Sequence, residues 1–189
     1  MISHKTEGLL NVAALFAISA VLLVAFADQI FGGELPCPLC LLQRAGFLLL
    51  AIGPVLTVAR GPHPAHYGIT VLAGLAGAGF AMRQVLLHIE PGDAGFGAPF
   101  LGLHFYTWAF IVFVVAIAAS AAMMLLRDPA PAEARDPRDR AAWPAFGTLA
   151  VALIVLLAAA NTLSTVLECG AETCPDDPVV YQLLNAPGS

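Results

Sequence analysis

Charged residues are scarce in this chain. Lys, Arg, Asp and Glu make up 11% of its 189 residues, whereas a soluble domain carries roughly 25%. The sequence also lacks an internal repeat and any polar stretch long enough to build a core of its own. These absences exclude a water-soluble globular protein and indicate that lipid is the main solvent of the chain.

Five apolar runs take up most of the sequence, and each is long enough for a helix to cross a bilayer core, which needs about 20 residues. None shows the alternation of apolar and polar residues that is typical of membrane β-strands. They lie approximately at Leu9–Phe31, Leu41–Ala59, Tyr67–Ile89, Leu103–Leu126 and Ala145–Leu167. We therefore predict an all-α membrane protein, a four-helix transmembrane bundle plus a fifth transmembrane helix.

Outside the apolar runs, which contain Arg44 and Arg83, the basic residues all lie on one side of the membrane in an alternating topology. Lys5 precedes the first run, Arg60 follows the second, and four arginines separate the fourth from the fifth. The positive-inside rule makes this side cytosolic. We therefore expect a multi-pass protein of the bacterial inner membrane, with a cytosolic N-terminus and a periplasmic C-terminus. Its expected parts are the bundle, residues 1–126, a cytosolic loop, residues 127–144, and the fifth helix with a periplasmic tail, residues 145–189.

The first apolar run has an alternative interpretation. Lys5, the apolar run and Ala25–Phe26–Ala27 together resemble a secretory signal with a cleavage site. We expect a transmembrane helix instead, because the run is long for the apolar region of a signal. Either interpretation leaves every cysteine in place.

The chain has only four cysteines, in two pairs, and the topology places both pairs on the outer face, where disulfides persist. Cys37 and Cys40 open the second run. Pro38 suits the first position of a helix, so Cys37 would be the N-cap and Cys40 would lie in the first turn. Free N–H groups and the helix dipole favour a thiolate there. Arg44 follows on the same helix face, where it could stabilise the thiolate or hold a carbonyl oxygen of a ligand.

Besides a redox role, the cysteines could form a zinc site or structural disulfides. A Cys-x-x-Cys pair is often half of a zinc site, but Cys169 and Cys174 have the wrong spacing to complete one, so we expect no metal. A structural disulfide explains Cys169 and Cys174 well. It explains Cys37 and Cys40 poorly, because such a short loop adds little stability.

The segment from Pro36 to Arg44, with the sequence PCPLCLLQR, resembles the quinone-linked active-site segment of the disulfide bond formation protein B (DsbB) family. Weaker matches are Arg83–Val85 and Pro99–Leu103, with Trp108 following, and the similarity covers roughly residues 9–126. The resemblance implies an inner-membrane enzyme that takes electrons from a periplasmic thiol oxidase of the DsbA type and passes them to ubiquinone or menaquinone. It also implies that Cys40 faces the quinone ring, that Arg44 binds the quinone head, and that Cys37 exchanges with the second pair.

The sequence departs from the family at the second pair. In the family this pair lies in the outer loop between the third and fourth spans, but here that loop, Glu90–Gly102, has no cysteine. The fifth span instead brings Cys169 and Cys174 out on the side of the first pair. An odd number of spans is needed to place the two pairs on one side, and this favours a redox role for Cys169 and Cys174. The alternative is a structural disulfide that closes the end of the fifth helix.

Arg83 is the second arginine within a span, and a contact with the quinone or snorkelling to the interface explains it equally well. Two rival functions remain for the whole chain. One is a quinone reductase similar to vitamin K epoxide reductase, although that family carries its quinone-side Cys-x-x-Cys late in the chain. The other is a small transporter or membrane scaffold with structural disulfides.

Overall fold

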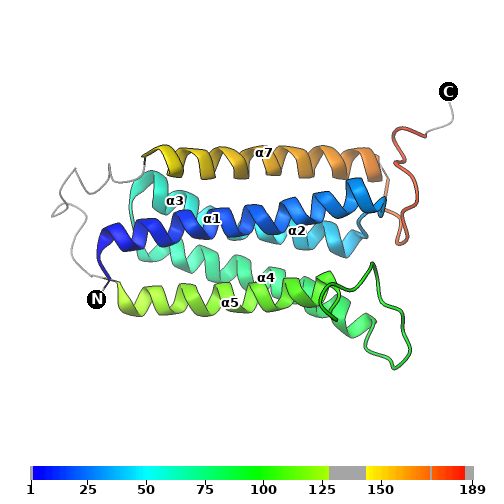
Figure 1. The fold of residues 1–189 in the computed structure, drawn as a ribbon, viewed down its shortest axis with the longest axis horizontal. Helices are drawn as coiled ribbons and strands as arrows, with labels where there is room; N and C mark the ends of the chain where they lie inside the picture. The colour runs from blue at the N-terminus through cyan, green and yellow to red at the C-terminus, as the bar shows by residue number, and fades with distance from the viewer. Residues whose placement is uncertain (1, 128–143, 171, 186–189) are drawn as a thin grey trace.

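The computed structural model describes residues 2–127, 144–170 and 172–185 and shows a bundle of long helices lying side by side (Figure 1). Within these ranges there is no β-strand, and only two isolated β-bridges occur. The elements are α1 (His4–Ala27), the short π-helix η1 (Asp28–Gly32), α2 (Pro38–Leu50), α3 (Ile52–Arg60), α4 (Pro64–Leu87), α5 (Phe105–Leu126) and α7 (Pro144–Cys169).

Five helical segments are long and apolar enough to cross a membrane. They are His4–Gly32, Pro38–Arg60, Pro64–Leu87, Phe105–Leu126 and Ala145–Cys169. The second combines α2 and α3, which meet at Ala51. The predicted all-α membrane fold is therefore confirmed, with each span close to its expected position. The expected cytosolic loop falls almost entirely on residues 128–143, which lie outside the described part of the chain.

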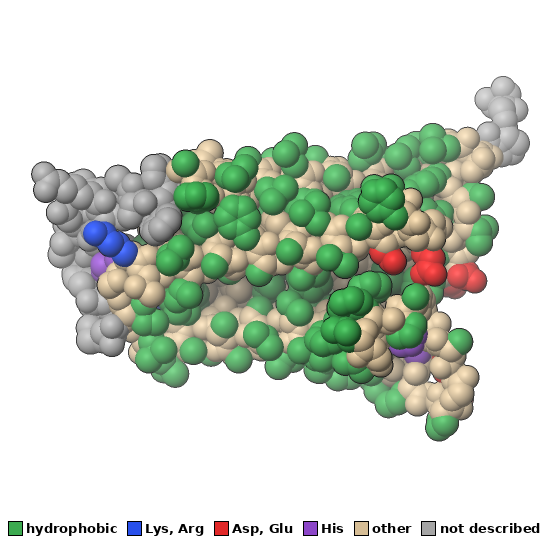
Figure 2. Space-filling model, viewed as in Figure 1, with side chains coloured by type: hydrophobic (Ala, Val, Ile, Leu, Met, Phe, Trp, Pro, Cys, Tyr) green, Lys and Arg blue, Asp and Glu red, His purple; other side chains and the backbone are tan. Residues whose placement is uncertain are grey.

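The bundle has two chemically different ends (Figure 1). The start of α2 and the end of α7 lie at one end, which we call the cysteine end. The start of α1 and the end of α5 lie at the other, which we call the N-terminal end. In the view of Figure 2, acidic side chains gather at the cysteine end, one basic patch lies at the N-terminal end, and apolar side chains cover the length between them.

The core runs along the bundle axis and includes the first helix. Leu15 and Leu22 of α1 are fully buried against the other helices. Phe47 of α2 and Phe113 of α5 stack with their ring centroids 4.2 Å apart. Because α1 supplies part of the core, it is a structural member of the bundle.

Glycines allow the closest helix contacts in the bundle. A Cβ atom on Gly77 of α4 would collide with the ring of Phe113, and one on Gly46 of α2 would lie 3.1 Å from the Cα of Gly77. In lipid, where apolar burial drives association weakly, such close backbone contact is a main source of helix affinity.

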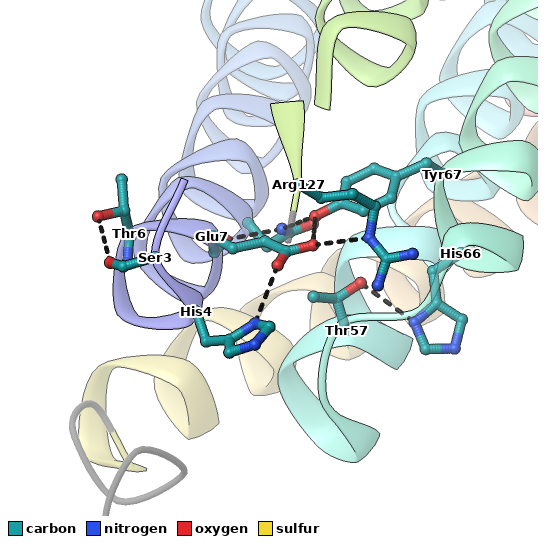
Figure 3. A network of polar contacts seen from close by, with 9 residues as sticks. Ser3, His4, Thr6, Glu7, Thr57, His66, Tyr67 and Arg127 are labelled. Carbon is teal, nitrogen blue, oxygen red and sulfur yellow. Dashed lines mark hydrogen bonds and ion pairs between the residues drawn. The ribbon is translucent and has the colours of Figure 1, made fainter. Parts of the chain in front are cut away.

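A buried polar cluster holds the N-terminal end together, and Figure 3 shows it around Glu7. The hydroxyl of Tyr67 on α4 donates to Glu7 Oε1 at 2.9 Å, and Asn11 Nδ2 donates to the Tyr67 oxygen at 2.9 Å. Arg127 Nε lies 3.8 Å from Glu7 Oε1, and His4 Nδ1 lies 3.4 Å from Glu7 Oε2. This Glu7 cluster therefore joins the ends of three helices around one fully buried carboxyl group.

Candidate functional site

The start of α2 has the predicted geometry. Cys37 is the N-cap, its Sγ accepts a hydrogen bond from the Cys40 N–H at 3.2 Å, and Pro38 occupies the first turn. Cys37 and Cys40 are joined as a disulfide. The first turn of a helix offers free N–H groups and the positive end of the dipole, so a thiolate released at Cys40 would be stabilised there.

Two glutamines beside this disulfide were missed as site residues by the sequence analysis. Gln84 of α4 is buried and donates through Nε2 to Cys37 Sγ at 3.3 Å and to Cys40 Sγ at 3.7 Å. Gln43 donates to Gln84 Oε1 at 2.6 Å and thereby orients the amide. The sequence did contain a signal for them, because each is a polar amide inside an apolar span. Placing such a group in lipid costs free energy unless it has a partner or a function.

A cavity of about 640 Å³ opens beside the disulfide, between α1, α2, α5 and the connection before α5. This size lies within the range of small-molecule sites, roughly 300–1,000 Å³. Its walls are largely apolar and aromatic, and Cys40 and Arg44 both line it. The expected common face of Cys40 and Arg44 is thus confirmed. Other lining residues include Leu22, Phe47, Phe100, Phe105, Tyr106 and Trp108.

Arg44 is held rigidly at the cavity wall. Its Nη1 donates to Gln29 Oε1 at 2.6 Å and its Nη2 donates to the Ala25 carbonyl at 2.8 Å. The guanidinium also lies 5.1 Å from the ring centroid of Phe26. A guanidinium carries five N–H donors, so these contacts leave donor capacity at the wall of the cavity.

Gln29 connects this site to the fifth helix. It belongs to η1, and π-helical turns of this kind often occur at functional sites. Its Nε2 donates to Ser164 Oγ of α7 at 2.8 Å and to the Tyr181 hydroxyl of the tail at 3.0 Å. One side chain therefore links Arg44, the end of α7 and the tail.

The second disulfide, Cys169–Cys174, lies where α7 ends. Cys169 is buried, whereas Cys174 in the following loop is half-buried. The tail folds back on the helix end, because Gln182 N donates to the Glu168 carbonyl at 3.3 Å and Leu183 N donates to the Leu167 carbonyl at 3.1 Å. Both disulfides thus lie at the cysteine end, as the parity of the spans predicted (Figure 1).

Arg83 is not part of this group. It is exposed on α4, and it is absent from the cavity wall formed by the described residues. The neighbouring residue Gln84 points to the disulfide instead. No set of three His, Cys, Asp or Glu side chains capable of holding a metal ion is found in the ranges that the structure describes.

The connection between α4 and α5 covers one side of the cavity. Asp93 accepts hydrogen bonds from the Gly95 N–H at 2.7 Å and from His88 Nδ1 at 3.1 Å. These two donors, the backbone N–H first, lower the pKa of Asp93 from its ordinary value. Trp108 Nε1 donates to the Phe100 carbonyl at 2.9 Å, which fixes the connection over the start of α5.

The fold and the site together define the class of protein. It is a helical multi-pass membrane protein in which a disulfide and an apolar cavity lie at the start of one helix. Residues 7–97 match the family model described as "Disulfide bond formation protein DsbB". Over this part, about half of its length, the chain is similar to the DsbB family. The match includes the first disulfide and Gln84 but ends before α5, so α7 and the second disulfide lie outside it.

Relatives named "Disulfide bond formation protein B" are similar to parts of the chain. The protein of Chromobacterium violaceum is 38% identical over 112 residues, 54% of this chain and 65% of its own length. That of Nitrosomonas eutropha is 40% identical over 63 residues, 31% of this chain and 39% of its own. That of Xanthomonas axonopodis pv. citri is 37% identical over 82 residues, 41% of this chain and 48% of its own.

The chain thus spans less than two thirds of the length of these curated relatives. No solved structure matches it significantly.

Proposed function

We propose that this protein is a membrane thiol oxidase that supports disulfide bond formation. It reoxidises a periplasmic thioredoxin-fold protein of the DsbA type and passes the electrons to ubiquinone or menaquinone. The single observation that carries this proposal is the apolar cavity whose wall contains both Cys40 and Arg44. The similarity of residues 7–97 to the DsbB family and the names of the relatives support the same activity.

The residues around the cavity fit a quinone. A lipid-soluble ring needs apolar and aromatic walls, and its carbonyl oxygens need a donor such as the Arg44 guanidinium. Cys40 lies at the same wall, at the positive end of α2. When bound, a quinone would accept the two electrons and two protons that are released as the Cys37–Cys40 disulfide re-forms.

The four cysteines act as a relay of thiol–disulfide exchange. The reduced partner attacks the Cys169–Cys174 disulfide and leaves as a disulfide itself, so that this pair becomes reduced. Its thiols then attack Cys37–Cys40 and release the Cys40 thiolate into the helix dipole. Gln84 donates to the sulfur atoms throughout and so holds them in place.

The same proposal fixes the orientation of the protein in the bacterial inner membrane. The cysteine end faces the periplasm, where the partner lies, and the N-terminal end faces the cytosol. The acidic side chains at the cysteine end and the basic ones at the other end support this orientation (Figure 2). In this arrangement residues 1–126 form the quinone-reducing bundle and residues 145–189 carry the partner-facing pair.

The test combines purified protein in detergent, a reduced DsbA-type protein and ubiquinone-1, whose absorbance reports reduction. Wild type should reduce the quinone, and Cys37→Ser and Cys40→Ser should lose this activity. Cys169→Ser should also stop electron flow from the protein partner. A scaffold or transporter would show no quinone reduction in any variant, and full activity in Cys169→Ser would exclude the relay.

A further inference from the structure

Glu168, immediately before Cys169, is a buried carboxyl group that the relay has not yet used. Its side chain has no exposed surface. Neither carboxylate oxygen has a hydrogen-bond partner in the part of the chain that the structure describes. An unpaired buried carboxylate is costly, and ionisable groups at membrane depth are usually functional.

The surroundings of Glu168 connect it to both redox centres. The guanidinium of Arg44 on α2, at the cavity wall, lies close enough to act electrostatically on the Glu168 carboxyl group. Asp28 of η1 and Tyr181 of the tail also interact electrostatically with the Arg44 guanidinium. Glu168 is therefore adjacent in the chain to Cys169 of the second disulfide and within electrostatic range of Arg44, the charged residue one helical turn after Cys40.

The two cysteines of the second pair have different exposures. Cys169 ends α7 with 6% of its surface exposed, whereas Cys174 is half-buried in the loop that follows. A soluble partner can approach Cys174 more easily. Cys169 and its neighbour Glu168 are both buried at the end of α7, a helix that contacts α2.

We propose that Glu168 takes the proton of the Cys169 thiol when Cys169 attacks the Cys37–Cys40 disulfide, with Cys174 serving as the partner-facing sulfur. The inference deepens the relay proposed above and rests on it. A thiol reacts as its thiolate, and the adjacent Glu168 carboxylate, which has no hydrogen bond among the described residues, is a suitable base.

Atoms and electrons balance in this step. The Cys169 thiolate forms a bond to Cys37 Sγ, the Cys37–Cys40 bond breaks, and Cys40 leaves as a thiolate. Cys174 then bonds to Cys169 and its proton passes to the departing Cys37 sulfur. The second pair ends oxidised, the first pair holds two electrons, and one proton remains on Glu168. That proton leaves when the electrons leave the first pair, which restores the carboxylate.

The experiment follows electron transfer between the two pairs without quinone. Full-length protein, stripped of quinone in detergent, is mixed with one equivalent of a reduced DsbA-type protein. Samples are quenched with acid at set times, alkylated and mapped by mass spectrometry. Glu168→Gln should slow transfer from the second pair to the first by about 10–100-fold at pH 7, within the usual range of base catalysis or slightly below it.

The pH profile distinguishes a proton acceptor from a structural residue. As pH approaches the ordinary thiol pKa of about 8.5, the thiolate forms without help, so the deficit of Glu168→Gln should shrink. Glu168→Asp, which keeps a carboxyl group, should recover part of the rate. Glu172→Gln is the matched control, because Glu172 lies exposed within the same disulfide loop and its loss should leave the rate unchanged.

Two results would overturn the inference while the relay survives. One is a Glu168→Gln rate equal to wild type at every pH, and the other is a deficit of the same size at every pH. The order of the cysteines has a separate test. The double variant Cys40→Ser/Cys174→Ser should accumulate a Cys37–Cys169 disulfide, and faster accumulation of Cys37–Cys174 in Cys40→Ser/Cys169→Ser would reverse the assignment.

Discussion

The two ends of the bundle each bury a glutamate, and the two glutamates differ in their surroundings. Glu7 at the N-terminal end accepts a hydrogen bond from Tyr67 through Oε1, and its Oε2, which has no hydrogen bond among the described residues, lies 3.4 Å from His4 Nδ1 (Figure 3). Glu168 at the cysteine end is equally buried, yet neither of its carboxylate oxygens has a hydrogen bond among the described residues. A buried carboxylate held by hydrogen bonds and charged neighbours stabilises a fold, whereas one without a hydrogen bond is free to exchange a proton. The comparison therefore assigns structure to one end and chemistry to the other.

The largest effect is expected when the reactive sulfur atom at the cysteine end is removed. Cys40→Ser should lower quinone reduction by at least about 10³-fold, since the sulfur that touches the cavity is lost and a hydroxyl cannot replace it. The measurement is ubiquinone-1 absorbance with a reduced DsbA-type protein. Unfolding in mixed micelles should change little, because the short Cys37–Cys40 loop adds little stability. Activity near the wild-type level would place the chemistry elsewhere.

Arg44→Lys tests how the cysteine end holds its ligand. The ammonium keeps the charge but cannot reach Gln29, Ala25 and the ligand with one planar group. We expect the KM for ubiquinone-1 to rise about 10-fold, with a smaller change in kcat. Arg83→Lys is the matched control, because Arg83 is an exposed arginine outside the cavity wall. An equal rise in KM for both variants would contradict the distinction between them.

Glu7→Gln tests the structural end. The amide keeps the shape but loses the charge that Arg127 faces and one acceptor of the buried cluster. Leaving buried partners unsatisfied costs about 1–3 kcal/mol, so the free energy of unfolding should fall by about that amount. Denaturant titration in mixed micelles gives this value. The kcat of the folded variant should match wild type, and a selective loss of kcat would break the comparison.

Glu168→Gln should give the reverse result in the same unfolding assay. With no hydrogen bond to lose in the described structure, the variant should be within about 0.5 kcal/mol of wild type or more stable, as expected for a substitution without a lost partner. Its defect should appear in electron transfer alone. A loss of stability equal to that of Glu7→Gln would show that both glutamates are structural.

Asp93 is an exposed carboxylate of the cysteine end and should show the smallest effect. Hydrogen bonds from Gly95 N and His88 lower its pKa when the connection is folded. Ionised Asp93 therefore stabilises the folded connection at pH values above the ordinary Asp pKa of about 3.9. This stabilisation is lost as the pH falls through the lowered pKa that Asp93 has in the folded protein. Limited proteolysis of the α4–α5 connection against pH checks this, with Asp93→Asn as the variant already lacking the dependence.

Most of the fold was predictable because the apolar runs leave the backbone few options. Chains in lipid must satisfy their own hydrogen bonds, so runs of this length form helices. The helix start at Cys37 was predictable for a local reason as well, since Pro38 and the N-cap position depend only on neighbouring residues. Arg44 followed from the helical repeat, which places it on the face of Cys40.

The partners of these residues were not predictable from local patterns. Gln84 meets the first disulfide from α4, 44 positions after Cys40, and Arg83 beside it faces outward. Which of two adjacent polar residues points inward depends on the rotation of α4 about its own axis. That rotation is set by packing contacts such as that of Gly77 with Phe113.

The sequence by itself determined the spans, the helix start at the first cysteine pair and the expectation that both pairs share one end. Each of these depends on composition, on local spacing or on counting membrane crossings. Only the tertiary structure decided that Gln29 joins Arg44 to α7, that Gln84 holds the disulfide, and that Tyr67 donates to Glu7 while Glu168 has no hydrogen bond among the described residues. Those outcomes depend on which helix faces meet, and burial makes each of them energetically significant.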